Sequence, residues 1–200
     1  MDLRQISDFC RKNSILLVVD NCFATPYLQK PLSLGADIVI HSATKYLDGQ
    51  GRVMGGAIIA GHEIISRIFP FMKNAGPSLS PFNAWVLSKS LETLAVRMDR
   101  HCENALKVAS WLESRPEVKE VRYPFLASHD GYDTARSQMK AGGGMVSFEL
   151  RGGMEAGKKM IDNRSMMSLS ANLGDTRTII THPASSTHSK LSAGDRAAAG

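Results

Sequence analysis

Three short apolar runs in the first 60 residues predict the framework of the chain. Ile15–Asp20 is an apolar run that ends in an acid, Ala36–His41 repeats this pattern with the apolar residues Ile38–Ile40 before its polar end, and Gly56–Ala60 is a third run flanked by glycines. Such runs are typical of parallel strands that are buried on both faces of a sheet. A helix precedes them, with Asp2 as its expected N-cap and its end near Asn13. The pattern therefore predicts an α/β sheet.

Helical spacing of apolar residues begins at His62. It predicts a helix over His62–Met72, a long helix over Pro81–Met98, and a helical continuation over Asp99–Ser114. We expect these helices to join a larger domain, residues 1–114, to a smaller one, residues 115–200.

Short elements alternate in the second domain, which predicts a small α+β unit. Strands are expected at Val118–Tyr123, Met145–Leu150, Ser168–Leu173 and Arg177–Ile180, and helices at Tyr132–Lys140, Met154–Ile161 and from Ser192 onward. Trp85 and Trp111 lie on apolar helix faces and are expected in the core. The ten methionines, Met166 and Met167 among them, are expected to fill gaps in the core and in interfaces.

Composition narrows the class of protein only slightly. The net charge of +5 comes from scattered lysines and arginines without a basic stripe, so it does not indicate nucleic-acid binding. No stretch approaches the roughly 18 apolar residues of a membrane helix. The three cysteines and six histidines lack the spacing of a disulfide framework or a metal site. With an N-terminus unlike a signal peptide, the expected location is the cytoplasm.

The segment DIVIHSATKY, residues 37–46, places three polar side chains at the C-terminal end of a predicted strand. Ser42 and Thr44 flank a small alanine, so both hydroxyls can reach one anion, and Lys45 follows directly. Open α/β sheets bind ligands at the carboxyl ends of their strands. A lysine beside anion-binding hydroxyls suits a Schiff base with a phosphorylated aldehyde. The alternative is an ordinary lysine in a surface loop.

Asp20 adds a second group to this candidate site. It ends a predicted strand beside the strand that leads to Lys45. Pyridoxal phosphate (PLP) needs a carboxylate at its ring nitrogen, because the protonated ring is the better electron sink. For Asp20 alone, a turn acid or a helix N-cap is the alternative. Nearby, His41 is expected to be packed rather than to act as a base, and Cys22 to be a small buried hydrophobe rather than a reactive thiol.

The segment VVDNCFATPYLQKPLSLGADIVIHSATKYLDGQG resembles the active-site signature of the PLP-dependent enzymes of Cys/Met metabolism. This family includes cystathionine γ-synthase, cystathionine lyases, methionine γ-lyase and homoserine-ester sulfhydrylases. The resemblance continues through AGPSLSPFNAW, LETLAVRMDRHCENA, GGGMVSFEL and SANLGDTRTIITHPASSTHS. It implies the PLP-dependent aminotransferase-like fold (fold type I). Residues 1–114 would be part of its large domain and residues 115–200 part of its smaller α+β domain.

The resemblance also implies roles for individual residues. Lys45 would bind the cofactor covalently and then act as a mobile base and acid. Asp20 would pair with the pyridinium nitrogen, and Ser42 and Thr44 would bind the phosphate. Asn172 falls where the family places a residue, more often a serine, near the substrate carboxylate.

The segments KYLDGQGRVMGGA and GPSLSPFNAW most resemble the corresponding segments of family members that act on O-succinylhomoserine. This implies γ-replacement of succinate by sulfide, which gives homocysteine in methionine biosynthesis. The alternatives are cystathionine synthesis with cysteine as the nucleophile, and γ- or β-elimination as in methionine γ-lyase or the cystathionine lyases. The family further implies a homotetramer built as a dimer of dimers.

Three expected features of the family have no match here. A ring-stacking tyrosine and a glycine-rich phosphate turn normally precede the lysine strand, and an arginine near the C-terminus normally binds the substrate carboxylate. The residues before Lys45 do not match the first two, and the chain reaches Gly200 before the third; Arg177 lies in a different motif. We therefore expect an internal piece of a longer enzyme. The alternative is a non-catalytic fragment or pseudoenzyme that serves as an interaction module.

Overall fold

The computed structural model describes residues 1–192, 194 and 195. Its helices are α1 (Leu3–Lys12), α2 (Thr25–Leu28), α3 (His62–Ala75), α4 (Pro81–Leu91), α5 (Leu94–Glu113), α6 (Tyr132–Gln138) and α7 (Gly153–Asp162). Its strands are β1 (Val18–Asp20), β2 (Ile38–Ser42), β3 (Gly56–Ala60), β4 (Val118–Arg122), β5 (Ser147–Leu150), β6 (Ser168–Leu169) and β7 (Ile179–Ile180). The helix expected from Ser192 onward lies largely outside the described residues.

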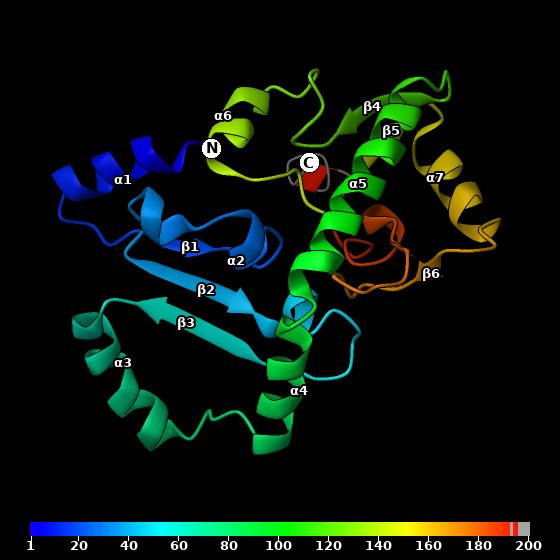
Figure 1. Ribbon diagram of the computed structural model, residues 1–200. Coiled ribbons are helices and arrows are strands. Elements are labelled where there is room, and N and C mark those ends of the chain that lie inside the picture. Colours follow the sequence, from blue (N-terminus) through cyan, green and yellow to red (C-terminus); the bar gives the residue numbers. More distant parts are fainter. Residues whose placement is uncertain (193, 196–200) are drawn as a thin grey trace.

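The first three strands form one sheet in the order β1-β2-β3 (Figure 1). β1 and β2 are parallel, with Asp20 opposite Ile40. β3 pairs with β2 in the antiparallel sense, so the expectation of three parallel strands is wrong for β3. The physical reason is the connection: it contains a single π-helical turn, Ala43–Leu47, rather than the crossover helix that parallel pairing requires.

Burial of the strands also departs from the expectation. On β2, Val39 and His41 are buried, whereas Ile40, which points to the opposite face, is 38% exposed. Val18 of β1 and Ile58 of β3 are exposed as well. The described residues therefore cover one face of β2 and leave apolar side chains open on the other.

The long helix expected from Pro81 is interrupted. α4 ends at Leu91 and α5 begins at Leu94, because side chains at the junction bond to the backbone in place of helical continuation. The hydroxyl of Ser90 donates to the Val86 carbonyl at 2.7 Å, and that of Thr93 donates to the Ser90 carbonyl at 3.1 Å. α5 then runs between the three-stranded sheet and the β4–β5 pair (Figure 1).

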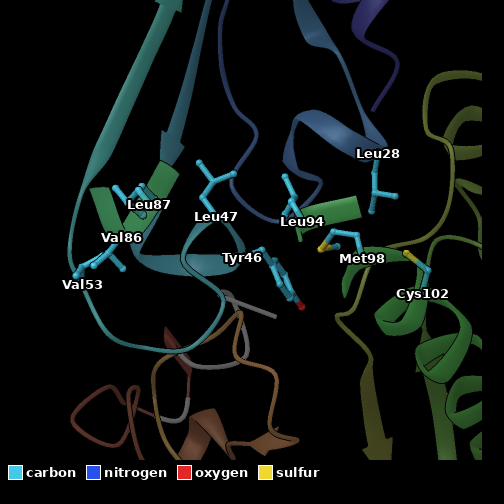
Figure 2. Close-up of a cluster of buried hydrophobic side chains, with 10 residues drawn as sticks. Leu28, Tyr46, Leu47, Val53, Val86, Leu87, Leu94, Met98 and Cys102 are labelled. Atoms are coloured by element: carbon cyan, nitrogen blue, oxygen red, sulfur yellow. The ribbon is translucent and has the colours of Figure 1, made fainter. Parts of the chain in front are cut away.

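One hydrophobic cluster lies where the sheet meets α4 and α5. Figure 2 shows Tyr46 and Leu47, from the turn after β2, among apolar side chains of these helices. Met98 of α5 is fully buried there, as expected for a methionine that fills a gap in the core. Trp85 and Trp111 are 59% and 58% exposed, so the prediction that they lie in the core is wrong. Met166 is 86% exposed and does not fill a gap in the core, and its expected place in an interface stays a prediction. The described chain covers only part of the apolar faces of α4 and α5, and the rest of these faces is exposed.

A second cluster joins α5 to the antiparallel pair β4–β5. Val118 and Val121 of β4 are both buried although they are three positions apart. A register shift between Val118 and Glu120 inserts an extra residue, which brings both valines to the same face. The expected strand is thus confirmed, with a bulge. The boundary between residues 114 and 115 stays a prediction; α5 ends at Glu113, just before it.

The remaining expected elements between Val118 and Ile180 are present, and all but α7, which is extended by one residue at each end, are shorter than expected. β6 and β7 are two-residue strands that pair in parallel, whereas the sequence predicts longer ones. Among the described residues, no helix has the length and apolar character needed to cross a membrane.

Candidate active site

Asp20 ends β1 and Ser42 ends β2, and these two strands are parallel neighbours. The segment that contains Asp20 and the segment that leads to Lys45 therefore meet at one edge of the sheet. The Asp20 carboxylate is exposed and accepts a hydrogen bond from the backbone N–H of Cys22 at 3.0 Å. The thiol and backbone N–H of Cys22 lower the pKa of Asp20, so this carboxylate is held in its charged form.

Cys22 connects the two strand ends. Its Sγ accepts the backbone N–H of Ser42 at 2.7 Å, while its thiol bonds to Asp20. Burial, followed by the hydrogen bond to Asp20, raises the pKa of the thiol. The expectation that Cys22 is buried is confirmed, but the side chain is more than a small hydrophobe, because it fixes Asp20 relative to the start of the Lys45 turn.

His41 lies beneath this edge and is 4% exposed. Burial lowers the pKa of His41 and so favours the neutral ring, although the negative charge of Asp20 acts in the opposite direction. Within the described residues, its Nδ1 has no hydrogen-bond partner. The expectation that His41 is a packed residue is confirmed.

The loop after Asp20 is held by a buried amide. Asn21 donates from Nδ2 to the carbonyls of Thr25 and Gln29, at 3.1 and 3.0 Å. Thr25 is fully buried and has a φ of 60°, a backbone conformation that β-branched residues rarely adopt. These bonds stabilise that conformation, so the loop shape is set by Asn21, a residue that the sequence did not single out.

Lys45 lies in the π-helical turn directly after β2. Its backbone departs from helical geometry, with φ −86° and ψ −133°, and its side chain is partly buried. The π geometry brings the N–H of Asp48 to the carbonyl of Ala43 at 3.0 Å, and the N–H of Gly49 bonds to the carbonyl of Lys45 at 2.8 Å. Single π turns are frequent at functional sites, because they redirect one side chain without ending the element.

The two hydroxyls that flank Ala43 differ in their surroundings. The hydroxyl of Thr44 contacts the backbone of Gly55, from which it accepts an N–H bond at 3.2 Å. The side chain of Ser42 is partly buried, and no hydrogen bond of its Oγ is found in the described part of the chain. Binding of one anion by both hydroxyls stays a prediction.

A distant segment completes the surroundings of Lys45. Asn172 lies in the S-A-N-L-G-D motif, and its Oδ1 accepts a hydrogen bond from Lys45 Nζ at 3.2 Å. The segment is anchored by the N–H of Thr176, which donates to the Gly49 carbonyl at 2.9 Å. The structure therefore brings together two residues that the sequence predicted separately.

Gly174 packs directly on the lysine turn. It has a φ of 85°, and a Cβ built on it would lie 2.6 Å from the backbone N of Tyr46 and 2.8 Å from the carbonyl carbon of Lys45. Only glycine fits both the conformation and the space. Beside it, Asp175 is buried, and hydrogen bonds from Arg177 lower the pKa of its carboxyl.

These groups match the chemistry of PLP. Asp20, Ser42, Thr44 and Lys45 lie at or directly after the carboxyl ends of β1 and β2, and they could supply a charged carboxylate for the ring nitrogen, hydroxyls for the phosphate and an amine for the aldehyde. The unpartnered Nδ1 of His41 lies under the same edge. No group of three or more His, Cys, Asp or Glu side chains within the described ranges could hold a metal ion.

Solved structures show the same architecture. Cystathionine gamma synthase from Xanthomonas oryzae pv. oryzae, in complex with aminoacrylate and cysteine, superposes with a TM-score of 0.95 at 41% identity over 100% of this chain and 52% of its own. Cystathione gamma lyase from Micromonospora echinospora superposes with a TM-score of 0.94 at 31% identity, covering the same shares of the two chains. The fold is that of the PLP-dependent enzymes of fold type I, as the resemblance implied.

A sequence model of the Cys/Met metabolism PLP-dependent enzyme family matches residues 1–200. The chain belongs to this family. Among curated relatives, O-succinylhomoserine sulfhydrylase of Pseudomonas aeruginosa is 49% identical over 200 residues, which is 100% of this chain and 50% of that protein. L-methionine gamma-lyase of Fusobacterium nucleatum subsp. polymorphum is 47% identical over 203 residues, covering 100% and 51%. The chain thus spans about half the length of the relatives it matches.

Proposed function

We propose that Lys45 is the residue that binds PLP and that the protein catalyses γ-replacement on O-succinylhomoserine with sulfide, giving homocysteine and succinate. The observation that carries the proposal is the meeting of Lys45 Nζ and Asn172 Oδ1 at 3.2 Å, beside the strand that ends in Asp20. The 49% identity to an O-succinylhomoserine sulfhydrylase supports this choice of substrate.

Each residue has a part in holding the cofactor. Lys45 Nζ would bind its aldehyde, and the hydroxyls of Ser42 and Thr44 would donate to its phosphate. The Asp20 carboxylate, which Cys22 keeps charged, would pair with the ring N–H. The neutral ring of His41 adds no second charge beneath that pair. When bound, the cofactor supplies the electron sink that stabilises negative charge at the substrate α-carbon.

The chemistry left to the chain is mainly proton transfer. Once the substrate amine has displaced it, Lys45 Nζ becomes a free base beside the α-carbon and can take the α-proton. The same amine can then return a proton as the γ-substituent leaves and sulfide adds. Asn172 would orient the substrate carboxylate through its amide, while its oxygen holds Lys45 in the interval between these steps.

Product analysis tests the reaction. The purified protein would be incubated with PLP and O-succinylhomoserine, with and without sulfide. We expect homocysteine and succinate in the presence of sulfide. Keto acid and ammonia in both samples, with no homocysteine, would show that replacement is the wrong reaction.

The second candidate is γ-elimination, which the 47% identity to L-methionine gamma-lyase favours. It predicts release of methanethiol, keto acid and ammonia from methionine. A 41% identical cystathionine beta-lyase of Coxiella burnetii extends this candidate to β-elimination of cystathionine. Protein that retains no PLP and converts none of these substrates would favour the non-catalytic alternative.

We further propose that the protein forms a homo-oligomer in the cytoplasm, a tetramer of two dimers by its family. The apolar side chains left open on β1, β3 and the outer faces of α4 and α5 support association. Light scattering of the purified protein measures the oligomeric mass, and a monomer at micromolar concentration would contradict it.

A further inference from the structure

Arg97 of α5 contacts the turn that carries Lys45. Its Nη1 donates to the backbone carbonyl of Tyr46, the residue after Lys45, at 2.8 Å. The turn Ala43–Leu47 is too short to satisfy its own last carbonyls, which is the general condition at helix ends. The backbone N–H of Gly49 donates to the Lys45 carbonyl, and Arg97 donates to the carbonyl of the next residue, Tyr46.

The other two arms of the guanidinium hold the junction between α4 and α5. Nη2 donates to the Ser90 carbonyl at 3.0 Å, and Nε donates to the Thr93 hydroxyl at 3.1 Å. The Ser90 carbonyl also accepts from the hydroxyl and the backbone N–H of Thr93, so Arg97 adds a further donor to this junction from one turn along α5. One rigid fork therefore ties the helix junction to the Lys45 turn.

Arg97 packs closely against Gly49. Gly49 has a φ of 73°, and a Cβ built there would lie 2.2 Å from Arg97 Nη1. The side chain is half-buried, and burial lowers the pKa of its guanidinium, so its donors depend on protein partners. Arg52 binds at the same junction: its Nε donates to the buried Asp48 carboxylate at 3.0 Å, and its Nη2 donates to the Ser90 hydroxyl at 2.6 Å.

We propose that Arg97 is a positioning residue for Lys45: by fixing the Tyr46 carbonyl to the α4–α5 junction, it sets the direction in which the lysine amine leaves the turn. The inference rests on the proposed role of Lys45 as the residue that binds PLP. Gly174 sets the distance of the turn from the Asn172 segment, and Arg97 sets its orientation.

The test is the rate at which Lys45 captures PLP. Protein and PLP would be mixed, quenched with borohydride at increasing times, and the label on Lys45 quantified by mass spectrometry over a series of PLP concentrations. Arg97→Met keeps the length of the side chain and removes all three donors. We expect its maximal rate to fall about 10- to 100-fold, the usual consequence of a misplaced reacting group. The half-saturating PLP concentration should stay near the wild-type value, because Ser42 and Thr44 would still bind the phosphate.

A merely structural role would give a different result. Loss of folded protein lowers the final amount of label but leaves the rate constant of the folded fraction unchanged. The matched control is Arg100→Met, which removes an exposed arginine from the next turn of α5, where its partner is Glu103. Its rate should equal that of the wild type.

A milder variant keeps the test decisive if Arg97→Met does not fold. Thr93→Val removes the acceptor of Arg97 Nε together with the hydroxyl's own bond to the Ser90 carbonyl, and it leaves Arg97 with its other two bonds. We expect a fall of about two- to tenfold, because one of the three hydrogen bonds of Arg97 is lost. A wild-type rate constant in a folded Arg97→Met, or in Thr93→Val if the first variant is unfolded, overturns the positioning role. Absence of label on wild-type Lys45 instead refutes the proposed function itself.

Discussion

Lys45 and Asn172 are separated by 127 positions in the chain, yet the amine of one donates to the amide oxygen of the other at 3.2 Å. The contact joins the end of β2 to a segment of the predicted smaller domain. A site assembled in this way depends on the packing of both regions, so substitutions far from Lys45 should affect it.

Asn172→Ala should separate substrate binding from cofactor binding. Because Lys45 keeps its amine, labelling with PLP should persist, whereas KM for O-succinylhomoserine should rise about tenfold or more with the loss of a hydrogen bond to a charged group. Asn172→Ser, the residue more common in the family, should recover part of this loss. Steady-state kinetics measures both, and an unchanged KM in Asn172→Ala would contradict the substrate role. Asn163→Ala, at the exposed end of α7, is the control.

Gly174→Ala should destabilise the protein and abolish PLP labelling of Lys45. The added methyl would overlap the backbone of Lys45 and Tyr46. Gly76 is a matched control, because its φ of 80° is close to the 85° of Gly174 and a Cβ there meets nothing within 4 Å. The conformational cost is therefore shared, at about 1 kcal/mol, and urea unfolding should show a larger loss only for Gly174→Ala. Equal losses for the two variants would refute the close-packing explanation.

The pH dependence of Asp20 provides a test of Cys22. Because the folded-state pKa of Asp20 lies below its ordinary value, its charge stabilises the folded chain above that value, and this contribution is lost as the pH falls through the folded pKa. Cys22→Ala removes the thiol bond, so the titration midpoint of Asp20 should rise toward the ordinary value. Carbon NMR of the Asp20 carboxyl measures the midpoint. Cys10→Ala, in the buried side of α1, should leave it unchanged.

Much of the active-site region follows from local sequence pattern. Residues close in the sequence determine the strand before Lys45 and the position of Asp20 at the end of β1. The same holds for the start of α1, where Asp2 accepts hydrogen bonds from the backbone N–H groups of Arg4 and Gln5. Asn172 was found only through the family resemblance, because nothing local to it signals a contact with Lys45.

The residues that the sequence missed act through tertiary contact. In the sequence, nothing distinguishes Arg97 from other charged residues on a helix or Gly174 from other loop glycines. In the folded chain both residues contact the Lys45 turn. The opposite error concerns Trp85 and Trp111. A helical apolar stripe predicts burial but does not say which surface covers it, and within the described chain these side chains stay exposed.

Substitution of Met98 and of Met166 should have very different effects on the free energy of unfolding. Met98 is fully buried in the cluster around Tyr46, so Met98→Ala should lower the free energy of unfolding by about 2–5 kcal/mol. Met166 is 86% exposed, and Met166→Ala should have an effect within about 0.5 kcal/mol. Urea unfolding of the two variants in parallel measures the difference. A small loss for Met98→Ala would contradict the packing of α5 against the Lys45 turn.

The most direct measurement is the site of covalent PLP attachment. The purified protein would be incubated with PLP, reduced with borohydride, digested and sequenced by mass spectrometry, with Lys45→Ala as the test variant and Lys89→Ala, an exposed lysine paired with Glu92, as the control. We predict one stoichiometric label on Lys45, retained in Lys89→Ala and absent from Lys45→Ala. Labelling of another lysine at equal stoichiometry, or labelling that survives in Lys45→Ala, would contradict the assignment.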